Sequence, residues 1–236
     1  GGSGMGAIAN ILIQKGYEVS GSDVKESDVI ERFRQMGATV HIGHNADYVQ
    51  GVDAVVRSTA IREDNPEIVA AKEQGITILH RSDIVKAVLD VTNGIAVAGA
   101  HGKTSTTSMI GQILVEGQME PTVIIGGEVD YLKGSSCLGK GEYSVVEADE
   151  SDGSFLKLRP KTIVITNIED DHMDHYKTME NLLNAFCQFV ETLPVDGKAV
   201  VCGDNDNIRY VMSKVNRQFI TYGLEEANDY AANIIH

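Results

Sequence analysis

The chain contains few cysteines, fewer basic than acidic residues and no long apolar run. Its cysteines, Cys137, Cys187 and Cys202, are scattered without a Cys-x-x-Cys pair, which excludes a disulfide framework and a cysteine zinc site. Lysine and arginine number 20 against 34 acidic residues, a formal net charge of −14 that argues against a nucleic-acid surface. No stretch approaches the ~18 apolar residues of a membrane span, and no secretory leader is visible. We therefore expect a cytoplasmic protein that inserts into no membrane.

The pattern of apolar segments predicts two α/β domains that meet near residue 90. The first, residues 1–90, alternates short strands with helices, and the second, residues 91–236, has apolar strands that each run into polar clusters. This alternation indicates parallel sheets with helices on their faces. In the first domain we expect helices over 7–15, 26–36 and 66–74, the last capped by Asn65 with Pro66 in its first turn, and strands over 17–23, 39–42 and 54–57.

A phosphate-binding loop is indicated directly after the apolar run 95–98. It reads Gly99-Ala100-His101-Gly102-Lys103-Thr104-Ser105, a tight glycine turn followed by a Lys-Thr pair that opens a helix. The N–H groups of such a turn attract an anion, the lysine reaches the terminal phosphates and the threonine hydroxyl binds Mg²⁺. The loop is shorter than the general P-loop pattern, which needs a glycine where Val97 stands.

The segment after this loop has helical spacing, with apolar residues at Met109-Ile110 and Ile113-Leu114. We expect Lys103 to be an exposed loop residue. Its replacement by alanine should then leave the fold intact and remove phosphate binding.

Acidic residues and histidines follow two further strands of the second domain. Glu147, with Asp149 and Glu150, follows the run 143–146, and His172 lies in the acidic segment after 162–165. Functional residues collect at the carboxyl ends of strands in open α/β sheets. We therefore expect Glu147 and His172 to join Thr104 around a metal if their strands flank the one that ends at the loop. His175, by contrast, is expected to be an ordinary polar residue.

The opening glycines resemble part of a dinucleotide-binding fingerprint. Gly2-x-Gly4-x-x-Ala7 fits its looser form, and Asp23 lies close to the offset of a ribose-binding acid. The strand that should precede such a loop is absent, so we expect a Rossmann-like sheet without its first strand and with an exposed flank.

In combination, these motifs resemble the Mur ligase family over essentially the whole chain. The resemblance is carried by the opening glycines, Ser20-Gly21-Ser22-Asp23, Ser58-Thr59-Ala60-Ile61, the phosphate loop, Glu147-Ala148-Asp149-Glu150-Ser151-Asp152 and Thr166-Asn167-Ile168-Glu169-Asp170-Asp171-His172. The opening glycines, the Ser-Gly-Ser-Asp segment and the Glu-Ala-Asp-Glu-Ser-Asp segment narrow it to the type that adds L-alanine. Ala100 departs from the family, which usually has threonine there.

The resemblance implies a Rossmann-like UDP-binding domain followed by a P-loop ATPase domain, without the extreme N-terminus and the C-terminal domain. It implies an ATP- and Mg²⁺-dependent ligase that joins L-alanine to UDP-N-acetylmuramate through an acyl phosphate and forms ADP. Lys103, Glu147 and His172 would be catalytic, and residues 99–105 would bind ATP. The UDP group would lie against Gly2, Ser3, Gly4, Met5, Asp23, Ser58, Thr59 and Ala60.

Three other functions stay open at this point. The nearest is the related ligase that attaches a recycled tripeptide to the same UDP-sugar, which has the same ATPase motifs. An NAD-dependent oxidoreductase would fit the first domain alone, and the phosphate loop speaks against it. A metallohydrolase could use His172 and His175, but it would need a His-x-His group, and the seven histidines include none.

Overall fold

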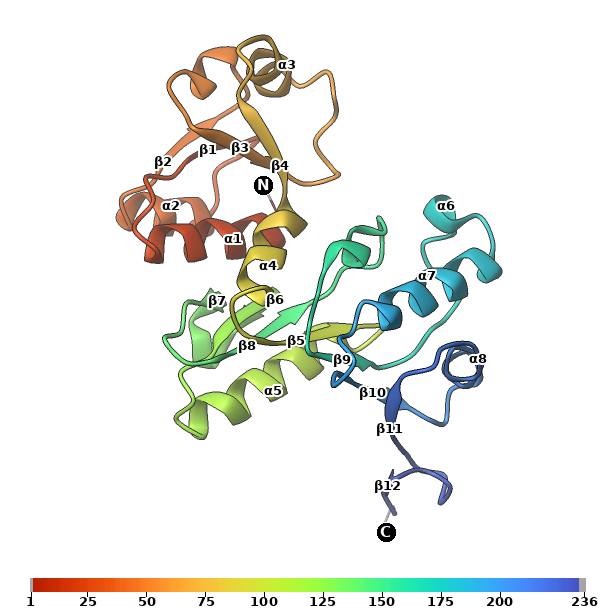
Figure 1. Cartoon of the computed structure of the whole chain (residues 1–236). Helices are drawn as coiled ribbons and strands as arrows, with labels where there is room; N and C mark the ends of the chain where they lie inside the picture. Colours follow the sequence, from red (N-terminus) through yellow and green to blue (C-terminus); the bar gives the residue numbers. More distant parts are fainter. Residues whose placement is uncertain (1, 234–236) are drawn as a thin grey trace. The chain divides into compact units, whose positions relative to one another are not determined.

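Helices and strands alternate through most of the chain in the computed structural model, which describes residues 2–233 (Figure 1). The chain forms two compact units: unit 1 comprises residues 1–85 and 124–138, and unit 2 comprises residues 86–123 and 139–236. The sequence predicted one division near residue 90. The structure divides the chain differently, because the segment 124–138 returns to unit 1.

Unit 1 contains short parallel strands that pair two by two. β1 (Ser20–Asp23) pairs with β2 (Thr39–Ile42), and β3 (Ala54–Arg57) pairs with β4 (Thr77–His80). The helical elements are α1 (Ser3–Gln14), α2 (Asp28–Gln35), the 3-10 helix η1 (Ala46–Val49), α3 (Pro66–Glu73) and the start of α4 (Arg81–Leu89). The sequence predicted a single parallel sheet here, and the structure has two separate pairs.

Local sequence signals explain where the helices of unit 1 begin. The Asn65 side chain accepts a hydrogen bond from Glu67 N at 2.9 Å, and Pro66 occupies the first turn of α3, which confirms the predicted cap. Ser27 caps α2 in the same way. α1 begins at Ser3, four positions before the predicted residue 7, so that Gly4 and Gly6 are helical rather than part of a loop.

The returning segment explains why unit 1 is not continuous in sequence. Its strand β7 (Gly134–Cys137) packs against α1. The Asn10 side chain donates to Ser136 O at 2.9 Å, and the Ser136 hydroxyl donates to Ala7 O at 2.9 Å in a buried environment. Such contacts join residues more than 120 positions apart, and no local pattern predicts them.

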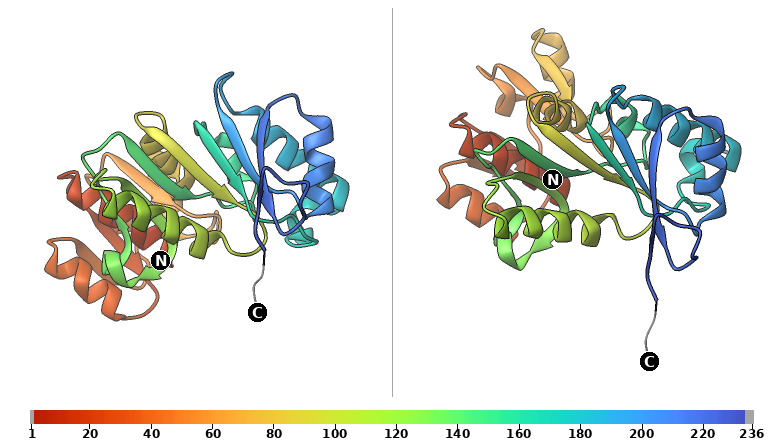
Figure 2. Two further views of the ribbon diagram at one scale, coloured as in Figure 1. Left: turned by 90° about the horizontal axis from the view of Figure 1, so that it is seen from below. Right: turned by 60° about the horizontal axis from the view of Figure 1, so that its bottom comes forward.

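Unit 2 contains the strands that follow one another in the order β12-β11-β10-β9-β5-β8 in the larger sheet (Figure 2). The central strand β5 (Asn93–Ala98) lies between β8 (Tyr143–Glu147) and β9 (Thr162–Ile165), and it is parallel to both. The other strands of unit 2 are β10 (Lys198–Cys202), β11 (Gln218–Gly223) and β12 (Tyr230–Ala231), and β6 (Thr122–Val129) begins in unit 2 and continues into the segment 124–138 of unit 1. The helices of unit 2 are α5 (Lys103–Glu116), α6 (Met173–Tyr176), α7 (Met179–Glu191) and α8 (Asp206–Lys214), with the 3-10 helix η3 (Ser154–Lys157). The 3-10 helix η2 (Asp130–Leu132) lies in the segment 124–138 of unit 1.

The core of unit 2 is apolar around β5 and under α7. Ala96, Val97 and Ala98 are fully buried, as continuous apolar runs are in parallel sheets. Phe155 of η3 contacts Phe186 and Phe189 of α7, with ring centroids 5.4 and 4.7 Å apart. This aromatic cluster anchors the segment that follows β8, and that segment contributes to the site described below.

α5 packs on β5 and β8, and its most buried positions are small residues, while Ile110 and Leu114 are half-buried. Thr107 and Gly111 are buried, whereas Met109 and Ile113 are 59% and 70% exposed. A glycine and a threonine allow the helix backbone to approach the sheet closely. The helical spacing therefore predicted the helix, and its two most buried positions, Thr107 and Gly111, are not among the apolar residues noted in the sequence.

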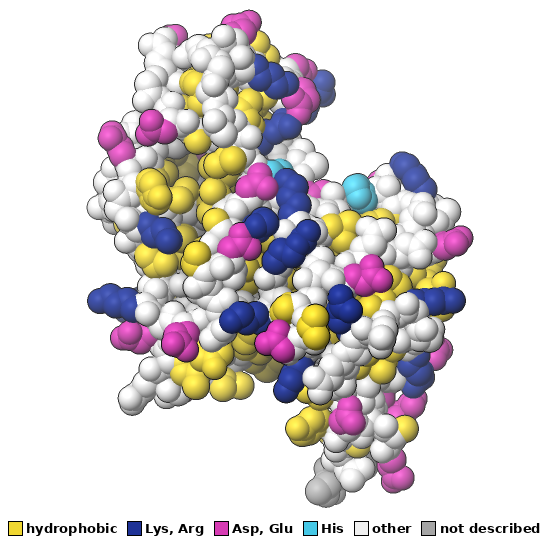
Figure 3. Space-filling model, viewed as in Figure 1, with side chains coloured by type: hydrophobic (Ala, Val, Ile, Leu, Met, Phe, Trp, Pro, Cys, Tyr) yellow, Lys and Arg dark blue, Asp and Glu magenta, His cyan; other side chains and the backbone are white. Residues whose placement is uncertain are grey.

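The formal net charge of the chain is −14. On the face drawn in Figure 3, acidic and basic side chains are interspersed. Within residues 2–233, none of the helices combines the length and the apolar character that crossing a membrane requires.

Candidate active site

The ends of three neighbouring strands form the core of the candidate site in unit 2. Val97 of β5 is in register with Glu147 of β8, and Ala98 is in register with Ile165 of β9. The strands are parallel, so their carboxyl ends open at one edge of the sheet. The strand adjacency on which the sequence argument depended is therefore present, and it brings the phosphate loop beside the segments after β8 and β9.

The phosphate loop is held from one side by the segment after β9. Asn167 accepts two hydrogen bonds from the backbone of the loop. Ala100 N donates to Asn167 O at 3.2 Å, and His101 N donates to Asn167 Oδ1 at 2.9 Å. The Thr166 hydroxyl donates to His101 O at 2.6 Å. Gly99 has a φ of 134°, and a Cβ there would lie 2.2 Å from Thr166 Oγ1. Only glycine fits at this position.

The N-terminus of α5 is free of side-chain capping. Gly102 is the N-cap, with a φ of 81°, and it makes no side-chain cap hydrogen bond. The backbone N–H groups of a helix's first turn have no intrahelical partner and carry partial positive charge. The first turn of α5 therefore has the features of an anion-binding site, as the sequence predicted for a phosphate loop.

Lys103 lies folded against the loop rather than extending into solvent. Its ammonium donates to Gly99 O at 2.6 Å and to Glu150 Oε1 at 2.6 Å, and its side chain is only 15% exposed. The expectation of an exposed lysine that supports little packing is therefore wrong. The cause is the buried carboxylate of Glu150, which the local sequence of the loop does not reveal.

Glu150 is the most buried charged residue of the site. Its side chain is 2% exposed, and its Oε2 atom makes no hydrogen bond to any residue that the structure describes. Burial raises the pKa of Glu150, while the neighbouring Lys103 ammonium acts in the opposite direction. Sequence reasoning noted this residue only as part of an acidic segment and gave it no role.

Thr104 and Glu147 form a second polar pair at the same sheet edge. The Thr104 hydroxyl donates to Glu147 Oε2 at 3.1 Å, which joins the first turn of α5 to the end of β8. A hydroxyl oxygen and a carboxylate oxygen at this separation are both hard donors of the kind that Mg²⁺ prefers.

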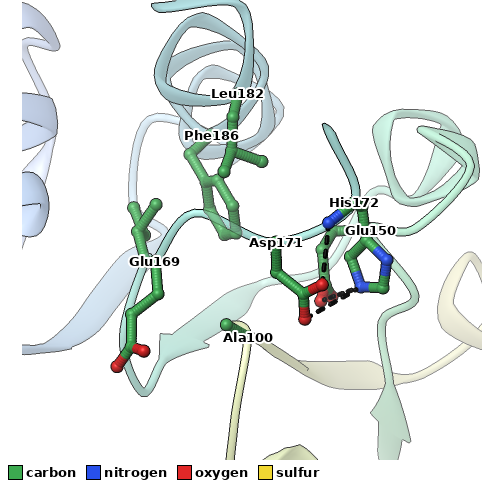
Figure 4. A pocket seen from close by; sticks show the side chains of 8 residues that line it. Ala100, Glu150, Glu169, Asp171, His172, Leu182 and Phe186 are labelled. Atoms are coloured by element: carbon green, nitrogen blue, oxygen red, sulfur yellow. Dashed lines mark hydrogen bonds and ion pairs between the residues drawn. The ribbon is translucent and has the colours of Figure 1, made fainter. Parts of the chain in front are cut away.

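His172 lies in a shallow pocket together with acidic residues from two segments (Figure 4). Its Nε2 atom is 3.5 Å from Glu150 Oε1 and 3.6 Å from Asp171 Oδ2. His172 has a φ of 57°, a left-handed conformation that costs a non-glycine residue energy and is frequent at functional sites. Its direct contacts are thus to Glu150 and Asp171, and its convergence with Thr104 and Glu147 on a metal stays a prediction.

The described residues contain no group of three or more histidine, cysteine, aspartate or glutamate side chains that could hold a metal by themselves. The ring of His175 packs edge-on against Tyr176, with centroids 4.7 Å apart. The ordinary role expected of His175 stays a prediction.

In unit 1, the predicted UDP-binding glycines lie at the start of α1. Gly2 is the N-cap without a side-chain cap bond, and Ser3, Gly4 and Met5 form the first turn. A Cβ on Gly4 would lie 2.4 Å from an Arg81 guanidinium nitrogen. The guanidinium therefore lies against this helix start, a contact that the sequence did not indicate because Arg81 belongs to a distant helix.

The other predicted UDP-binding residues follow β1 and β3. Asp23 is the last residue of β1, and Ser58, Thr59 and Ala60 form the turn after β3. The Thr59 hydroxyl lies 3.0 Å from Nε2 of His80, which ends β4. These residues stand at carboxyl ends of parallel strands, where ligands bind in open α/β sheets.

A serine, a histidine and a glutamate also meet in unit 1. The Ser22 hydroxyl donates to Glu67 Oε1 at 2.6 Å, and Nδ1 of His44 is 3.0 Å from Ser22 Oγ and 3.1 Å from Glu67 Oε1. In a catalytic triad the serine and the acid contact different ring nitrogens. Here both contact Nδ1, so this cluster does not have the geometry of an activated nucleophile.

Comparison of the sequence with protein-family models identifies the family of this chain. A family model described as the Mur ligase middle domain matches residues 97–236, and one described as the Mur ligase family, catalytic domain, matches residues 1–91. The chain belongs to the Mur ligase family. Its phosphate loop, Glu147, Glu150 and His172 all fall within the match to the middle domain.

Relatives and solved structures extend the similarity over both units. UDP-N-acetylmuramate–L-alanine ligase from Desulfatibacillum aliphaticivorans is 46% identical over 98% of this chain and 51% of its own length. MurC from Thermotoga maritima is similar in structure, with a TM-score of 0.85 and 30% identity over 96% of this chain and 51% of that one. A second similar structure is the UDP-N-acetylmuramate:L-alanyl-gamma-D-glutamyl-meso-diaminopimelate ligase from Neisseria, with a TM-score of 0.88 and 27% identity. The match covers 94% of this chain and 75% of that one. The chain spans about half the length of the curated relatives it matches.

Proposed function

We propose that this Mur ligase chain binds a UDP-sugar through unit 1 and ATP through unit 2, within an ATP-dependent ligase that joins L-alanine to UDP-N-acetylmuramate. The observation that carries the proposal is the sheet edge where the uncapped start of α5, the Lys103 ammonium and the Thr104–Glu147 pair lie together. Such an edge is suited to hold a nucleoside triphosphate. The relatives named as L-alanine ligases support the substrate assignment.

The geometry suits phosphoryl transfer because the residues present position and neutralise charge rather than attack. In the proposed reaction the muramyl carboxylate attacks the γ-phosphate, and the amine of L-alanine then displaces phosphate from the acyl phosphate. Lys103 would hold the transferring group, and the first-turn N–H groups of α5 would hold the phosphate oxygens. No side-chain nucleophile is needed, because ATP supplies the activation.

The Thr104–Glu147 pair fits a magnesium ion. Two ligands at right angles with bonds of about 2.0–2.1 Å lie about 2.9 Å apart. The observed 3.1 Å between Thr104 Oγ1 and Glu147 Oε2 is close to this spacing. When bound, Mg²⁺ would neutralise charge on the phosphate oxygens. We propose that Thr104 and Glu147 hold it and that His172 binds or orients a second ion.

Two experiments test this function at different levels. Titration calorimetry of the chain with UDP, NAD⁺ and a non-hydrolysable ATP analogue should show binding of UDP and the ATP analogue. Binding of NAD⁺ at micromolar concentration without UDP binding would favour the oxidoreductase alternative. A product assay of a full-length ligase carrying this chain, with L-alanine and the tripeptide as competing acceptors, distinguishes the two ligases.

The tripeptide ligase is kept as the second candidate because the Neisseria ligase of that kind is close in structure. Both candidates need the same phosphate loop and the same UDP-sugar contacts. Preferential formation of the tripeptide product would replace the L-alanine assignment and leave the ATPase assignment in place.

A further inference from the structure

The Lys103 ammonium is fully engaged by acceptors of the protein. It contacts Gly99 O at 2.6 Å, Ala100 O at 3.4 Å and Glu150 Oε1 at 2.6 Å. An ammonium group has three N–H donors. A phosphate oxygen can therefore bind Lys103 only if one of these contacts gives way, and the two carbonyls belong to the loop that must itself surround the phosphate.

Glu150 is fixed in place by its backbone as well as its burial. Its carbonyl accepts a hydrogen bond from Gly153 N at 3.1 Å and another from the Tyr176 hydroxyl. Its side chain is 2% exposed, and among the described residues Oε2 has no hydrogen-bond partner. A buried carboxylate is costly unless a cation compensates it. Glu150 therefore places a buried carboxyl group next to Lys103, and one of its oxygens, Oε2, has no hydrogen bond to the described residues.

We propose that Glu150 is a positioning residue that holds Lys103 in the absence of nucleotide and competes with phosphate for its ammonium. The inference rests on the proposed function, because it assigns Lys103 to a phosphate. Nucleotide binding then exchanges one charge-assisted hydrogen bond for another, and it leaves the Glu150 carboxylate close to an incoming anion. Glu150 thereby keeps the lysine ordered between turnovers and limits how tightly the ADP product is held.

The neutral variant Glu150→Gln separates this role from a structural one. Glutamine keeps the shape and an acceptor oxygen but removes the negative charge, and neutral hydrogen bonds are about half as strong as charge-assisted ones. In calorimetric titrations of the chain, we expect inorganic pyrophosphate and Mg·ADP to bind this variant about tenfold more tightly than wild type. Damage to the fold would weaken binding and cannot produce this gain.

Glu169→Gln is the matched control. Glu169 lines the same pocket, its side chain is 53% exposed, and its ion-pair contact is to His101 at 3.5 Å rather than to Lys103. We expect this variant to change pyrophosphate affinity by less than about twofold, because exposed charges are screened. An equal gain in both variants would mean a general charge effect and would overturn the proposal, as would weaker binding to Glu150→Gln.

Two further measurements keep the proposal testable if pyrophosphate binding is absent or the variant fails to fold. Labelling of Lys103 by an amine-reactive reagent, followed by mass spectrometry, should be several-fold faster in Glu150→Gln than in wild type. Unchanged labelling overturns the positioning role. In the wild-type chain, the carboxyl ¹³C resonance of Glu150 should shift when pyrophosphate is added. A resonance that stays constant at saturation overturns the proposed transfer of the Lys103 hydrogen bond from Glu150 to phosphate. Wild type that binds neither pyrophosphate nor Mg·ADP contradicts the proposed function, while the labelling rates still report on the Glu150–Lys103 contact.

Discussion

Replacement of Gly99 by alanine should disrupt the phosphate loop through a steric clash as well as backbone strain. Gly99 has a φ of 134°, and an added Cβ would lie 2.2 Å from Thr166 Oγ1 and 2.8 Å from Asn167 O. Thr166 and Asn167 are the residues that hold the loop, so relief of the clash displaces them. Strain of about 1–2 kcal/mol and overpacking of about 1–3 kcal/mol together predict a loss of about 3 kcal/mol.

Gly102→Ala is the control that isolates strain from the clash. Gly102 has a φ of 81°, and no heavy atom lies within 4 Å of the position its Cβ would take. Only the backbone penalty of about 1–2 kcal/mol applies there. The difference between the two variants therefore reports the contact with the segment after β9, because both carry the same side-chain change in the same loop.

Thermal unfolding of the chain, together with pyrophosphate titration, measures both effects. At about 2–4 °C per kcal/mol, the midpoint should fall by about 6–12 °C in Gly99→Ala and by about 2–8 °C in Gly102→Ala. Pyrophosphate binding should be lost in Gly99→Ala. Equal unfolding midpoints in the two variants, with pyrophosphate binding retained, would refute the claim that Thr166 and Asn167 hold the loop in place.

Three further predictions follow from the remaining contacts. Lys103→Ala should lower kcat of a full-length ligase carrying this chain by roughly 10²-fold or more, and near-normal turnover would contradict the assignment of Lys103 to phosphate. The same variant should destabilise unit 2 in thermal unfolding, because Glu150 loses its cation. Glu147→Gln should weaken binding of Mg·ADP about tenfold and leave binding of metal-free ADP unchanged, and equal weakening of both would argue against a magnesium ligand. The backbone N–H of Leu224 lowers the pKa of Asp204, so its stabilising contribution is present above pH about 4 and is lost as the pH falls through the native pKa. Asp204→Asn should therefore lower the melting temperature at pH 7, with a smaller difference from wild type near pH 2, and a constant difference would contradict this linkage.

Much of the secondary structure could be predicted because its causes are local. The apolar run before Gly99 became β5, and Asn65 with Pro66 started α3 as expected. Strand boundaries and helix starts differed by a few residues, as at α1, because glycines that permit a turn are also tolerated in a first helical turn. The argument for the site was conditional on the strands ending at Glu147 and Ile165 lying beside β5, and the structure meets that condition.

The burial of the site's charged groups could not be predicted from local patterns. Lys103 looked like an exposed lysine, and only the approach of Glu150 from the segment after β8 made it half of a largely buried ion pair. Asn167 likewise appeared in a recognisable motif without a role, and the fold uses its carbonyl and side chain to hold the loop. These contacts join residues 47 to 67 positions apart, and their formation depends on strand order.

The sequence by itself was enough to identify the family, to locate the phosphate loop and to show that polar residues follow the strands. These features could be read because glycine spacing, helix caps and apolar runs act over short distances. The tertiary structure alone decided that residues 124–138 pack with unit 1 and that Glu150 contacts Lys103. Parallel strands meet only when distant segments pack together. That packing turns an acid in a polar segment into a buried partner of the loop lysine.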